Sequence, residues 1–195
     1  HLIFVVKIKI IMKVSILGDG LTSLTLAKSL VNQGVNVDIF SERKTKKINK
    51  IQTIGISKAN IDFFNKNIYK INKFLWKINK IEIYSENLKN EKVLNFENKN
   101  EELFSVIKNF DLYKTLFVSL KKSNLVKFKK KVSYEILKKK NYKLIFNCDF
   151  NNLISKKFFN KRIKKDYNSF AYISILKHEK LSNNQTASQI FTKKG

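Results

Sequence analysis

One stretch, KVSILGDGLTSLTLAKSLVNQGVNVDIFSER (Lys13–Arg43), constrains the fold of this chain more than any other. It opens with an apolar run over Val14–Leu17, which is the length of a short buried strand. After a glycine-containing turn, Leu21–Gln33 repeats apolar residues at helical spacing, and a glycine follows where a helix would end. Val35–Phe40 then alternates like a second strand. The sequence therefore predicts a β-turn-α-β unit of the size that binds a mononucleotide.

The turn of this unit, Gly18-Asp19-Gly20, has the chemistry of a dinucleotide-binding turn. In such turns the first glycine allows a sharp change of direction, and the second lets the backbone approach a pyrophosphate. A third small residue allows helix and strand to pack closely, and Ser23 holds that position here. The start of the helix faces the negative charge. We therefore expect cofactor contacts along the turn and the first helical residues: Gly18, Asp19, Gly20, Leu21, Thr22 and Ser23.

An acidic residue at the end of the second strand is expected to accept hydrogen bonds from the adenosine ribose. The usual spacing leads to Ser41, and Glu42 follows one residue later. Either residue can fill this role, depending on a one-residue shift in the loop before the strand. A βαβ unit that binds nothing stays open as the alternative.

The middle of the chain changes from helical to strand-like patterns. Ser57 is placed to cap a helix over Ile61–Asn65, with Phe63 and Phe64 on its core face. INKIEIYSE and EKVLNFEN alternate apolar and polar residues on either side of Asn87–Asn90, which predicts an antiparallel hairpin. ELFSVIK adds another expected strand.

The second half returns to a helix and then to short apolar runs. Asp111–Lys122 has leucines at helical spacing, and Asp111 is expected to be its N-cap. Three short apolar runs follow at Leu125–Phe128, Val132–Leu137 and Tyr142–Asn147, and the third is expected to be a buried strand. The C-terminal tail contains two more expected strands, Phe170–Lys177 and Gln189–Thr192.

Composition restricts the class of protein. The 195 residues carry a net charge of +25, which is typical of proteins that bind nucleic acid or an anionic membrane, although scattered lysines also follow from A/T-rich coding. The single cysteine, Cys148, excludes an internal disulfide and is expected to be a small core residue. No apolar run has the length of a membrane span. His178 stands beside Glu179 without the further ligands that a metal needs, and is expected at the surface.

Beyond the first turn, the order of elements resembles the FAD-dependent aromatic-ring hydroxylases of the ubiquinone-biosynthesis branch. QTIGIS (Gln52–Ser57) stands where that family has an Arg-x-x-Ala-Leu/Ile-Ser motif, and FLWKINKIEIY contains the family's Leu-Trp at Leu75-Trp76. NCDFNNLISK (Asn147–Lys156) stands at the place of the second fingerprint, Gly-Ala-Asp-Gly-x-x-Ser-x-x-Arg. It keeps Asp149, whereas other residues replace its glycines and serine, and Gln52 replaces the arginine of the earlier motif.

This resemblance implies an α/β fold: a three-layer, Rossmann-like FAD/NAD(P)-binding domain with an inserted, partly complete antiparallel β substrate domain. It implies FAD as the cofactor, NAD(P)H as the reductant, and hydroxylation of an aromatic ring, with a lipid-tailed polyprenyl phenol of ubiquinone biosynthesis as substrate. Gln52 and Asp149 would join the FAD contacts, and Asp149 would support the loop beside the pyrophosphate. Trp76 is expected in the core.

The resemblance also implies a division of the chain into domains. Residues 1–11 are expected to be a non-native extension, because Met12 looks like the natural start. The chain is expected to be the N-terminal part of a longer enzyme, inactive by itself. The FAD-binding part, the antiparallel insertion, the return to the FAD-binding part and the start of a second substrate-domain segment are expected at 12–77, 78–110, 111–160 and 161–195.

Two other functions stay open. KNIYKINKFLWKINK interleaves lysines with aromatic residues, as single-stranded nucleic-acid binders do, although no recognisable binding motif accompanies it and no specific nucleic acid is expected. A non-catalytic flavoprotein remnant is the second alternative, since several motif positions have changed. The expected location is the cytoplasm, with peripheral contact between the basic surface and an anionic inner membrane.

Overall fold

The computed structural model describes two compact units, and each is treated by itself. Unit 1 comprises residues 1–47 and 115–167, and unit 2 comprises 48–114 and 168–195. Within them, the structure describes residues 12–41, 50–88, 91–99, 101–130, 133–140, 142–158, 163, 165–176, 179 and 184–193. Glu42, His178 and the extension 1–11 lie outside the described residues.

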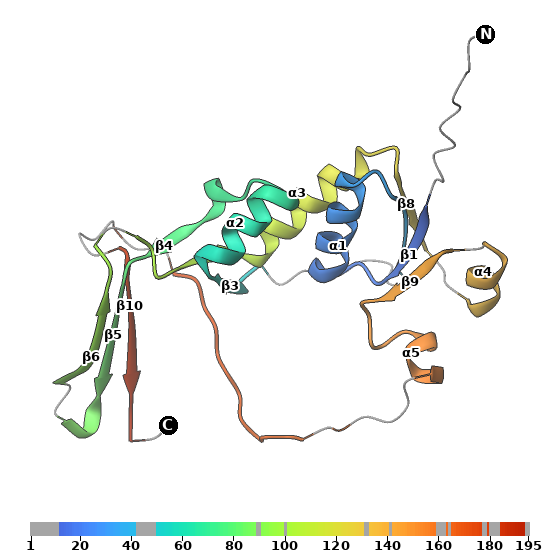
Figure 1. Ribbon diagram of the computed structural model, residues 1–195. Coiled ribbons are helices and arrows are strands. Elements are labelled where there is room, and N and C mark those ends of the chain that lie inside the picture. The colour runs from blue at the N-terminus through green and yellow to red at the C-terminus, as the bar shows by residue number, and fades with distance from the viewer. Residues whose placement is uncertain are drawn as a thin grey trace, which may run out of the picture. The chain divides into compact units, whose positions relative to one another are not determined.

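Unit 1 is built on a parallel sheet of four strands in the order β8-β2-β1-β9 (Figure 1). The strands are β1 (Lys13–Leu17), β2 (Asn36–Phe40), β8 (Val126–Lys129) and β9 (Leu144–Asn147). In the register of β1 and β2, Ile16 lies opposite Ile39. Almost every residue of these two central strands is buried, which is typical of a parallel sheet covered on both faces.

Helix α1 (Leu21–Asn32) connects β1 to β2 and contacts both strands. Leu24 and Ala27 on its inner face are fully buried. The helix ends at Asn32 with Gln33 as its C-cap, and the next residue, Gly34, has a φ of +77°, a left-handed conformation that favours glycine. The predicted β-turn-α-β unit is therefore confirmed, with bounds within one residue of those expected.

A second apolar cluster holds the loops after β8 and β9 against the sheet. Leu17 and Phe40, at the ends of β1 and β2, pack with Leu137 of α4 (Tyr134–Lys139). Ile154 of α5 (Leu153–Phe158) packs against the same cluster. Helix α3 (Asn109–Lys121), whose residues are divided between unit 2 and unit 1, has three buried leucines of its own, Leu112, Leu116 and Leu120.

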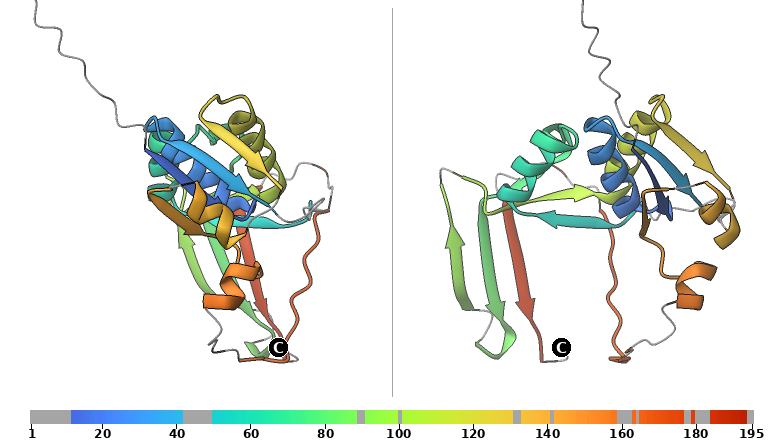
Figure 2. Two further views of the ribbon diagram at one scale, coloured as in Figure 1. Left: turned by 90° about the vertical axis from the view of Figure 1, so that its right-hand side faces the viewer. Right: turned by 45° about the vertical axis from the view of Figure 1, so that its right-hand side comes forward.

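Among the described residues, unit 2 holds an antiparallel sheet, a mixed sheet, one complete α-helix and the first residues of α3. The first sheet, in the order β3-β7-β4, is antiparallel and contains β3 (Thr53–Ile56), β7 (Phe104–Lys108) and β4 (Trp76–Ile78). The second has the order β10-β5-β6, and Figure 2 shows β10 in red beside the green strands of the hairpin. Its strands are β5 (Lys80–Ser85), β6 (Glu91–Glu97) and β10 (Thr186–Phe191), and β10 pairs with β5 in parallel. Helix α2 spans Lys58–Asn67, and two 3₁₀ turns span Asn72–Phe74 and Glu86–Leu88.

The hairpin carries a largely buried carboxylate. Glu82 of β5 accepts hydrogen bonds from Lys92 at 2.6 Å and from the Tyr84 hydroxyl at 2.8 Å, and Lys80 lies 2.9 Å away. The bonds from Lys92, Lys80 and Tyr84 lower the pKa of Glu82 to about 2. Glu82 therefore remains ionised at neutral pH and ties both strands of the hairpin together.

Several other predicted elements are confirmed. The hairpin pairs β5 with β6, and ELFSVIK contains β7. Ser57 caps α2, since its Oγ accepts a hydrogen bond of 3.4 Å from the amide of Asn60. The last predicted strand corresponds to β10, and the run at Leu125–Phe128 corresponds to β8.

Other expectations are wrong, and each has a local cause. Asp111 lies in the first turn of α3, not at its N-cap, because the helix already begins at Asn109. The side chain of Phe63 is 59% exposed, because Ile61 and Phe64 form the inner face of α2. The run Val132–Leu137, for which the sequence predicts no element type, contains the start of helix α4 in its described part, because Ser133 accepts a hydrogen bond from the amide of Ile136 and caps the helix.

Three further expectations are wrong, two about exposure and one about a strand. β9 is an edge strand with Leu144 and Ile145 half exposed, so Tyr142–Asn147 is not a buried strand. Residues 170–176, the described part of the predicted strand Phe170–Lys177, form no strand. Trp76 is 52% exposed and does not lie in the core, because its indole nitrogen donates to the carbonyl of Asn184 at the edge of unit 2. In the described part of the chain, no helix has the length and apolar character to cross a membrane.

Candidate functional site

The turn after β1 requires a glycine at position 18. Gly18 has a φ of +105°, in the region that side chains rarely adopt. Its amide donates a hydrogen bond of 2.7 Å to the carbonyl of Phe40, at the end of β2. A Cβ added to Gly18 would lie 2.9 Å from Cβ of Asp149 and 3.2 Å from Oγ of Ser23. Any residue other than glycine at position 18 would therefore displace the turn after β9.

The start of α1 leaves its amide donors without a side-chain cap. Gly20 is the N-cap residue, with extended backbone and no side chain to accept a hydrogen bond. The first turn of α1 contains no acidic residue. By contrast, serine side chains cap α2 and α4. Because the first amides of a helix have no partner within the helix, this end presents donors and a partial positive charge to an anion.

Ser23 completes the glycine-rich turn. It is fully buried in the first turn of α1 and lies against Gly18. Leu21 and Thr22 occupy the two preceding helical positions, where they carry the outermost amides. The six turn residues predicted from the sequence thus lie together, at the end of β1 and the start of α1.

The topology of the sheet gives this turn its position. From β1 the chain crosses to β2 on one side, whereas β9 pairs with β1 on the other side. In open parallel sheets, ligands bind at the carboxyl ends of the strands where such connections diverge. Gly18 follows β1, Ser41 follows β2, and Asp149 lies two residues beyond β9. Three of the predicted site segments therefore meet at one edge of the sheet.

At this edge, Ser41 is joined to Asp19. The hydroxyl of Ser41 donates a hydrogen bond of 2.8 Å to Oδ2 of Asp19. The amide of Ser41 donates to the carbonyl of Lys129, which fixes the end of β2 against β8. Glu42, the other residue predicted to contact the ribose, lies outside the described residues.

The turn after β9 is held by amide and hydroxyl side chains. Nδ2 of Asn152 donates to Oδ1 of Asn147 at 2.8 Å and to the carbonyl of Asp149 at 2.7 Å. Oγ of Ser155 also donates to the carbonyl of Asp149, at 2.9 Å, and accepts from Nδ2 of Asn147 at 2.6 Å. Where the fingerprint of the resembling family has glycines, hydrogen bonds of side chains hold this turn instead. These hydrogen bonds fix the position of Asp149 beside Gly18.

The sequence predicts Gln52 as a cofactor contact, which stays a prediction, and Cys148 as a small core residue. Gln52 belongs to unit 2, where its carbonyl accepts from the amide of Asn109 at the start of α3. Cys148 is half-buried after β9, and its amide donates to the carbonyl of Leu17. Burial raises the pKa of the Cys148 thiol, so it remains protonated at neutral pH.

Sequence reasoning missed a buried charge cluster in the same unit. Asp38 in the middle of β2 is 2% exposed and accepts short hydrogen bonds from Lys129 and from the Tyr142 hydroxyl. The ammonium group of Lys13 lies 3.3 Å from its carboxylate. Burial alone would raise the pKa of Asp38, but the bonds from Lys129 and Tyr142 outweigh it and keep this pKa below its usual range. The sequence signal was a lone acid inside the apolar run VDIF.

No family model matches the sequence, and no curated protein matches it significantly. Solved structures do match. One is PqsL from Pseudomonas aeruginosa, described as a probable FAD-dependent monooxygenase, at 15% identity and a TM-score of 0.50 over 60% of this chain and 32% of that one. Part of the fold is shared with that monooxygenase.

A second similar structure is p-nitrophenol 4-monooxygenase PnpA from Pseudomonas putida DLL-E4, at 13% identity and a TM-score of 0.50 over 61% of this chain and 31% of that one. A third is P. aeruginosa PqsL in complex with 2-aminobenzoylacetate, at 17% identity and a TM-score of 0.50 over 60% and 33%. The matched part is about a third of the length of each of these proteins. At these identities the likeness concerns the fold. Among the described residues, no group of histidine, cysteine and acidic side chains could hold a metal ion.

Proposed function

We propose that unit 1 binds the ADP part of FAD at the carboxyl edge of its parallel sheet, and that the chain belongs to a FAD-dependent monooxygenase. The observation that carries this proposal is the β1–α1 turn, with Gly18 in a left-handed conformation beside an α1 N-terminus that has no side-chain cap. The likeness in fold to PqsL and PnpA supports it.

The residues present fit the diphosphate of FAD in most respects. Gly18 and Gly20 leave the backbone accessible, and the amides of Leu21, Thr22 and Ser23 supply donors. Asp19 is the exception, because its carboxylate puts a negative charge in the turn. The hydrogen bond from Ser41 anchors that carboxylate at the end of β2. We infer that Ser41, with Glu42 after it, lies on the side of the adenosine ribose.

The other predicted residues would have supporting roles. The polar network after β9 holds Asp149 against Gly18, so Asp149 would set the shape of the pyrophosphate turn. For Gln52, a cofactor contact is proposed on the sequence resemblance alone.

When bound, FAD would supply the oxygen-transfer chemistry, with NAD(P)H as the proposed reductant. The chain's own contribution is to bind and orient the cofactor. An aromatic substrate is supported by the complex of PqsL with 2-aminobenzoylacetate. We propose a polyprenyl phenol of ubiquinone biosynthesis as the substrate, on the sequence resemblance. We propose a cytoplasmic location, and the net charge of +25 supports peripheral contact with an anionic membrane surface.

FAD titration of the full chain, followed by flavin fluorescence, tests the cofactor. Gly18→Ala is expected to abolish binding, because the new Cβ would meet Asp149 at 2.9 Å and φ is +105°. Gly55→Ala is the matched control, since its Cβ would meet only a ring carbon of Phe104, at the ordinary distance of 3.8 Å. Circular dichroism reports whether each variant folds. Equal FAD affinity in Gly18→Ala and the parent chain, with both folded, would overturn the proposal.

A further inference from the structure

Unit 2 contains an open pocket beside the exposed tryptophan. Its volume is about 440 Å³, within the range of small-molecule sites. Its lining comes from the 3₁₀ turn before β4, from β4 itself and from the residues before β10, namely Lys73, Phe74, Leu75, Trp76, Lys77, Asn184 and Gln185. All these residues belong to unit 2, so the pocket is formed within one compact part of the chain.

The aromatic wall of this pocket is held in place. The Trp76 indole nitrogen donates a hydrogen bond of 2.5 Å to the carbonyl of Asn184, although half of the side chain is exposed. The backbone of Trp76 is paired with Val106 in the β4–β7 ladder. An exposed ring with a fixed orientation offers its π-face to a planar ligand at little cost in conformational entropy.

The charge of the pocket favours an anion. Lys77 is balanced by Glu102, whose carboxylate lies 3.0 Å from its ammonium group. Lys73 has no acidic partner among the described residues, and its ammonium group lies 5.0 Å from the centroid of the Phe74 ring. The pocket therefore combines one uncompensated positive charge with two aromatic side chains.

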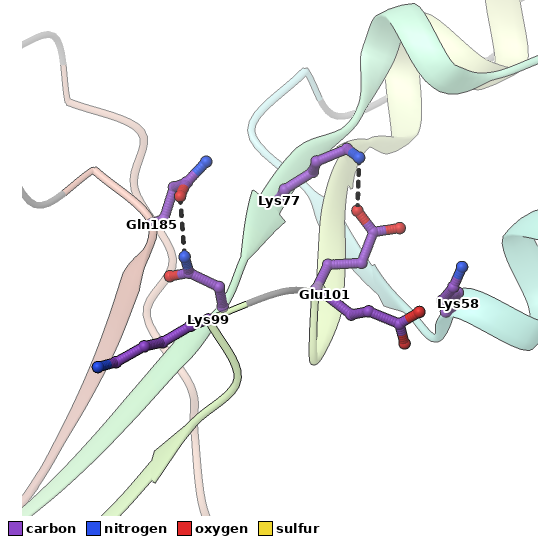
Figure 3. Close-up of a pocket in the computed structure, with 7 residues that line it drawn as sticks. Lys58, Lys77, Lys99, Glu101 and Gln185 are labelled. Carbon is purple, nitrogen blue, oxygen red and sulfur yellow. Dashed lines mark hydrogen bonds and ion pairs between the residues drawn. The ribbon is translucent and has the colours of Figure 1, made fainter.

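A neighbouring pocket has a mixed lining of lysines and glutamates. It has a volume of about 310 Å³ and shares Lys77 and Gln185 with the first (Figure 3). Its lining includes Glu101 and Glu102 beside Lys58 and Lys99, and Asn79 closes one side by a hydrogen bond of 3.0 Å to Gln185. The carboxylates of this second pocket thus lie among lysines of its own lining, and Glu102 is the partner of Lys77, which leaves Lys73, among the described residues, as the uncompensated charge of the first pocket.

We propose that the pocket of Lys73, Phe74, Trp76 and Lys77 binds a small planar aromatic carboxylate. The ring stacks on Trp76, and the carboxylate lies beside Lys73. This site is independent of the proposed FAD site, since every residue that forms it belongs to unit 2. It also accounts for the aromatic and lysine residues of KINKFLWK without requiring a nucleic acid.

Trp76 is the only tryptophan of the chain, so its fluorescence reports this pocket directly. The full chain is titrated with benzoate, benzamide, cyclohexanecarboxylate and a single-stranded oligothymidylate, with and without FAD. Benzoate is expected to change the Trp76 emission saturably. Benzamide, which lacks the charge, and cyclohexanecarboxylate, which lacks the planar ring, are expected to bind several-fold more weakly.

Substitution of Lys73 separates a specific site from general attraction to a basic surface. Lys73→Gln should weaken benzoate binding by about two- to fivefold, as expected for one partly exposed charge pair, and leave benzamide unchanged. Lys70→Gln is the matched control, because Lys70 is exposed in the same segment and does not line the pocket. Benzamide binding as tightly as benzoate, equal effects of Lys70→Gln and Lys73→Gln, or a response to the oligothymidylate alone would each overturn the proposal. None of these results depends on whether FAD binds.

Discussion

The hydroxyl of Ser41 donates a hydrogen bond of 2.8 Å to Oδ2 of Asp19, and so joins the end of β2 to the turn after β1 across 22 positions of sequence. The bond fixes a carboxylate beside the N-terminus of α1. There the charge stabilises the helix, because it faces the positive end of the macrodipole. The same charge opposes a bound diphosphate, so binding and stability depend on Asp19 in opposite directions.

Replacement of Asp19 by asparagine should therefore tighten FAD binding. The amide oxygen keeps an acceptor for Ser41, whereas the repulsion with the diphosphate disappears. We expect the Kd for FAD to fall by about two- to fivefold, more at low salt, while the helix loses about 0.3–1 kcal/mol of stability. Fluorescence titration and urea unfolding measure the two effects. Asp62→Asn on the exposed face of α2 is the control, and weaker binding by Asp19→Asn would contradict this prediction.

The contact between Gly18 and Asp149 predicts a second-site effect. If the crowding of the two Cβ atoms contributes to the loss of binding in Gly18→Ala, then removing the Cβ of Asp149 should restore part of it. The double variant Gly18→Ala with Asp149→Gly should bind FAD better than Gly18→Ala alone, but less well than the parent, because φ at position 18 stays at +105°. Identical affinities of the single and double variants would show that the contact is irrelevant.

Asp38 should dominate the acid stability of unit 1. Asp38→Asn removes the charge that compensates Lys129 and should lower the free energy of unfolding by about 2–4 kcal/mol at neutral pH. The native pKa of Asp38 is lowered, so its contribution is fully present above the unfolded value of about 4 and is lost as the pH falls through the native value. Urea unfolding between pH 7 and pH 2 should show the parent and Asp38→Asn converging at the acid end. A difference in unfolding free energy that stays constant from pH 7 to pH 2 would contradict this role of Asp38.

Tyr142, in the same cluster, should make the free energy of unfolding decrease at alkaline pH. Burial and the hydrogen bond to Asp38 raise the pKa of Tyr142 to about 12. Because this pKa is raised in the folded state, the stabilisation is complete below about pH 10, the usual tyrosine value, and is lost as the pH rises towards 12. Tyr142→Phe should lose about 1 kcal/mol at neutral pH and lack this alkaline decline. Urea unfolding at pH 8 and pH 11 measures this: the parent should lose stability between the two pH values, and Tyr142→Phe should lose less.

The sequence predicts the first β-turn-α-β unit closely because local rules agree there. Apolar alternation, a glycine pair and a terminal glycine all favour the same boundaries. The hairpin of β5 and β6 is predicted for the same reason. These patterns are short-range, so no knowledge of the rest of the fold is needed.

The errors arise where contacts distant in the sequence decide the outcome. Trp76 is half exposed, and its indole nitrogen finds its partner at Asn184, 108 residues away in the sequence. β9 reads as a buried strand, yet it pairs with β1 at an edge of the sheet. Asp38 finds Lys129 and Tyr142 only after β8 and the segment before β9 have been placed beside β2. No local pattern contains these partners.

The most direct measurement is two-dimensional amide NMR of the ¹⁵N-labelled chain during titration with FAD. If the opening amides of α1 hold the diphosphate, the signals of Gly20, Leu21, Thr22 and Ser23 will shift more than those of α2, and in proportion to the bound fraction. FAD that binds while these four amides stay unchanged would contradict the central claim, as would a folded chain that binds no FAD at all.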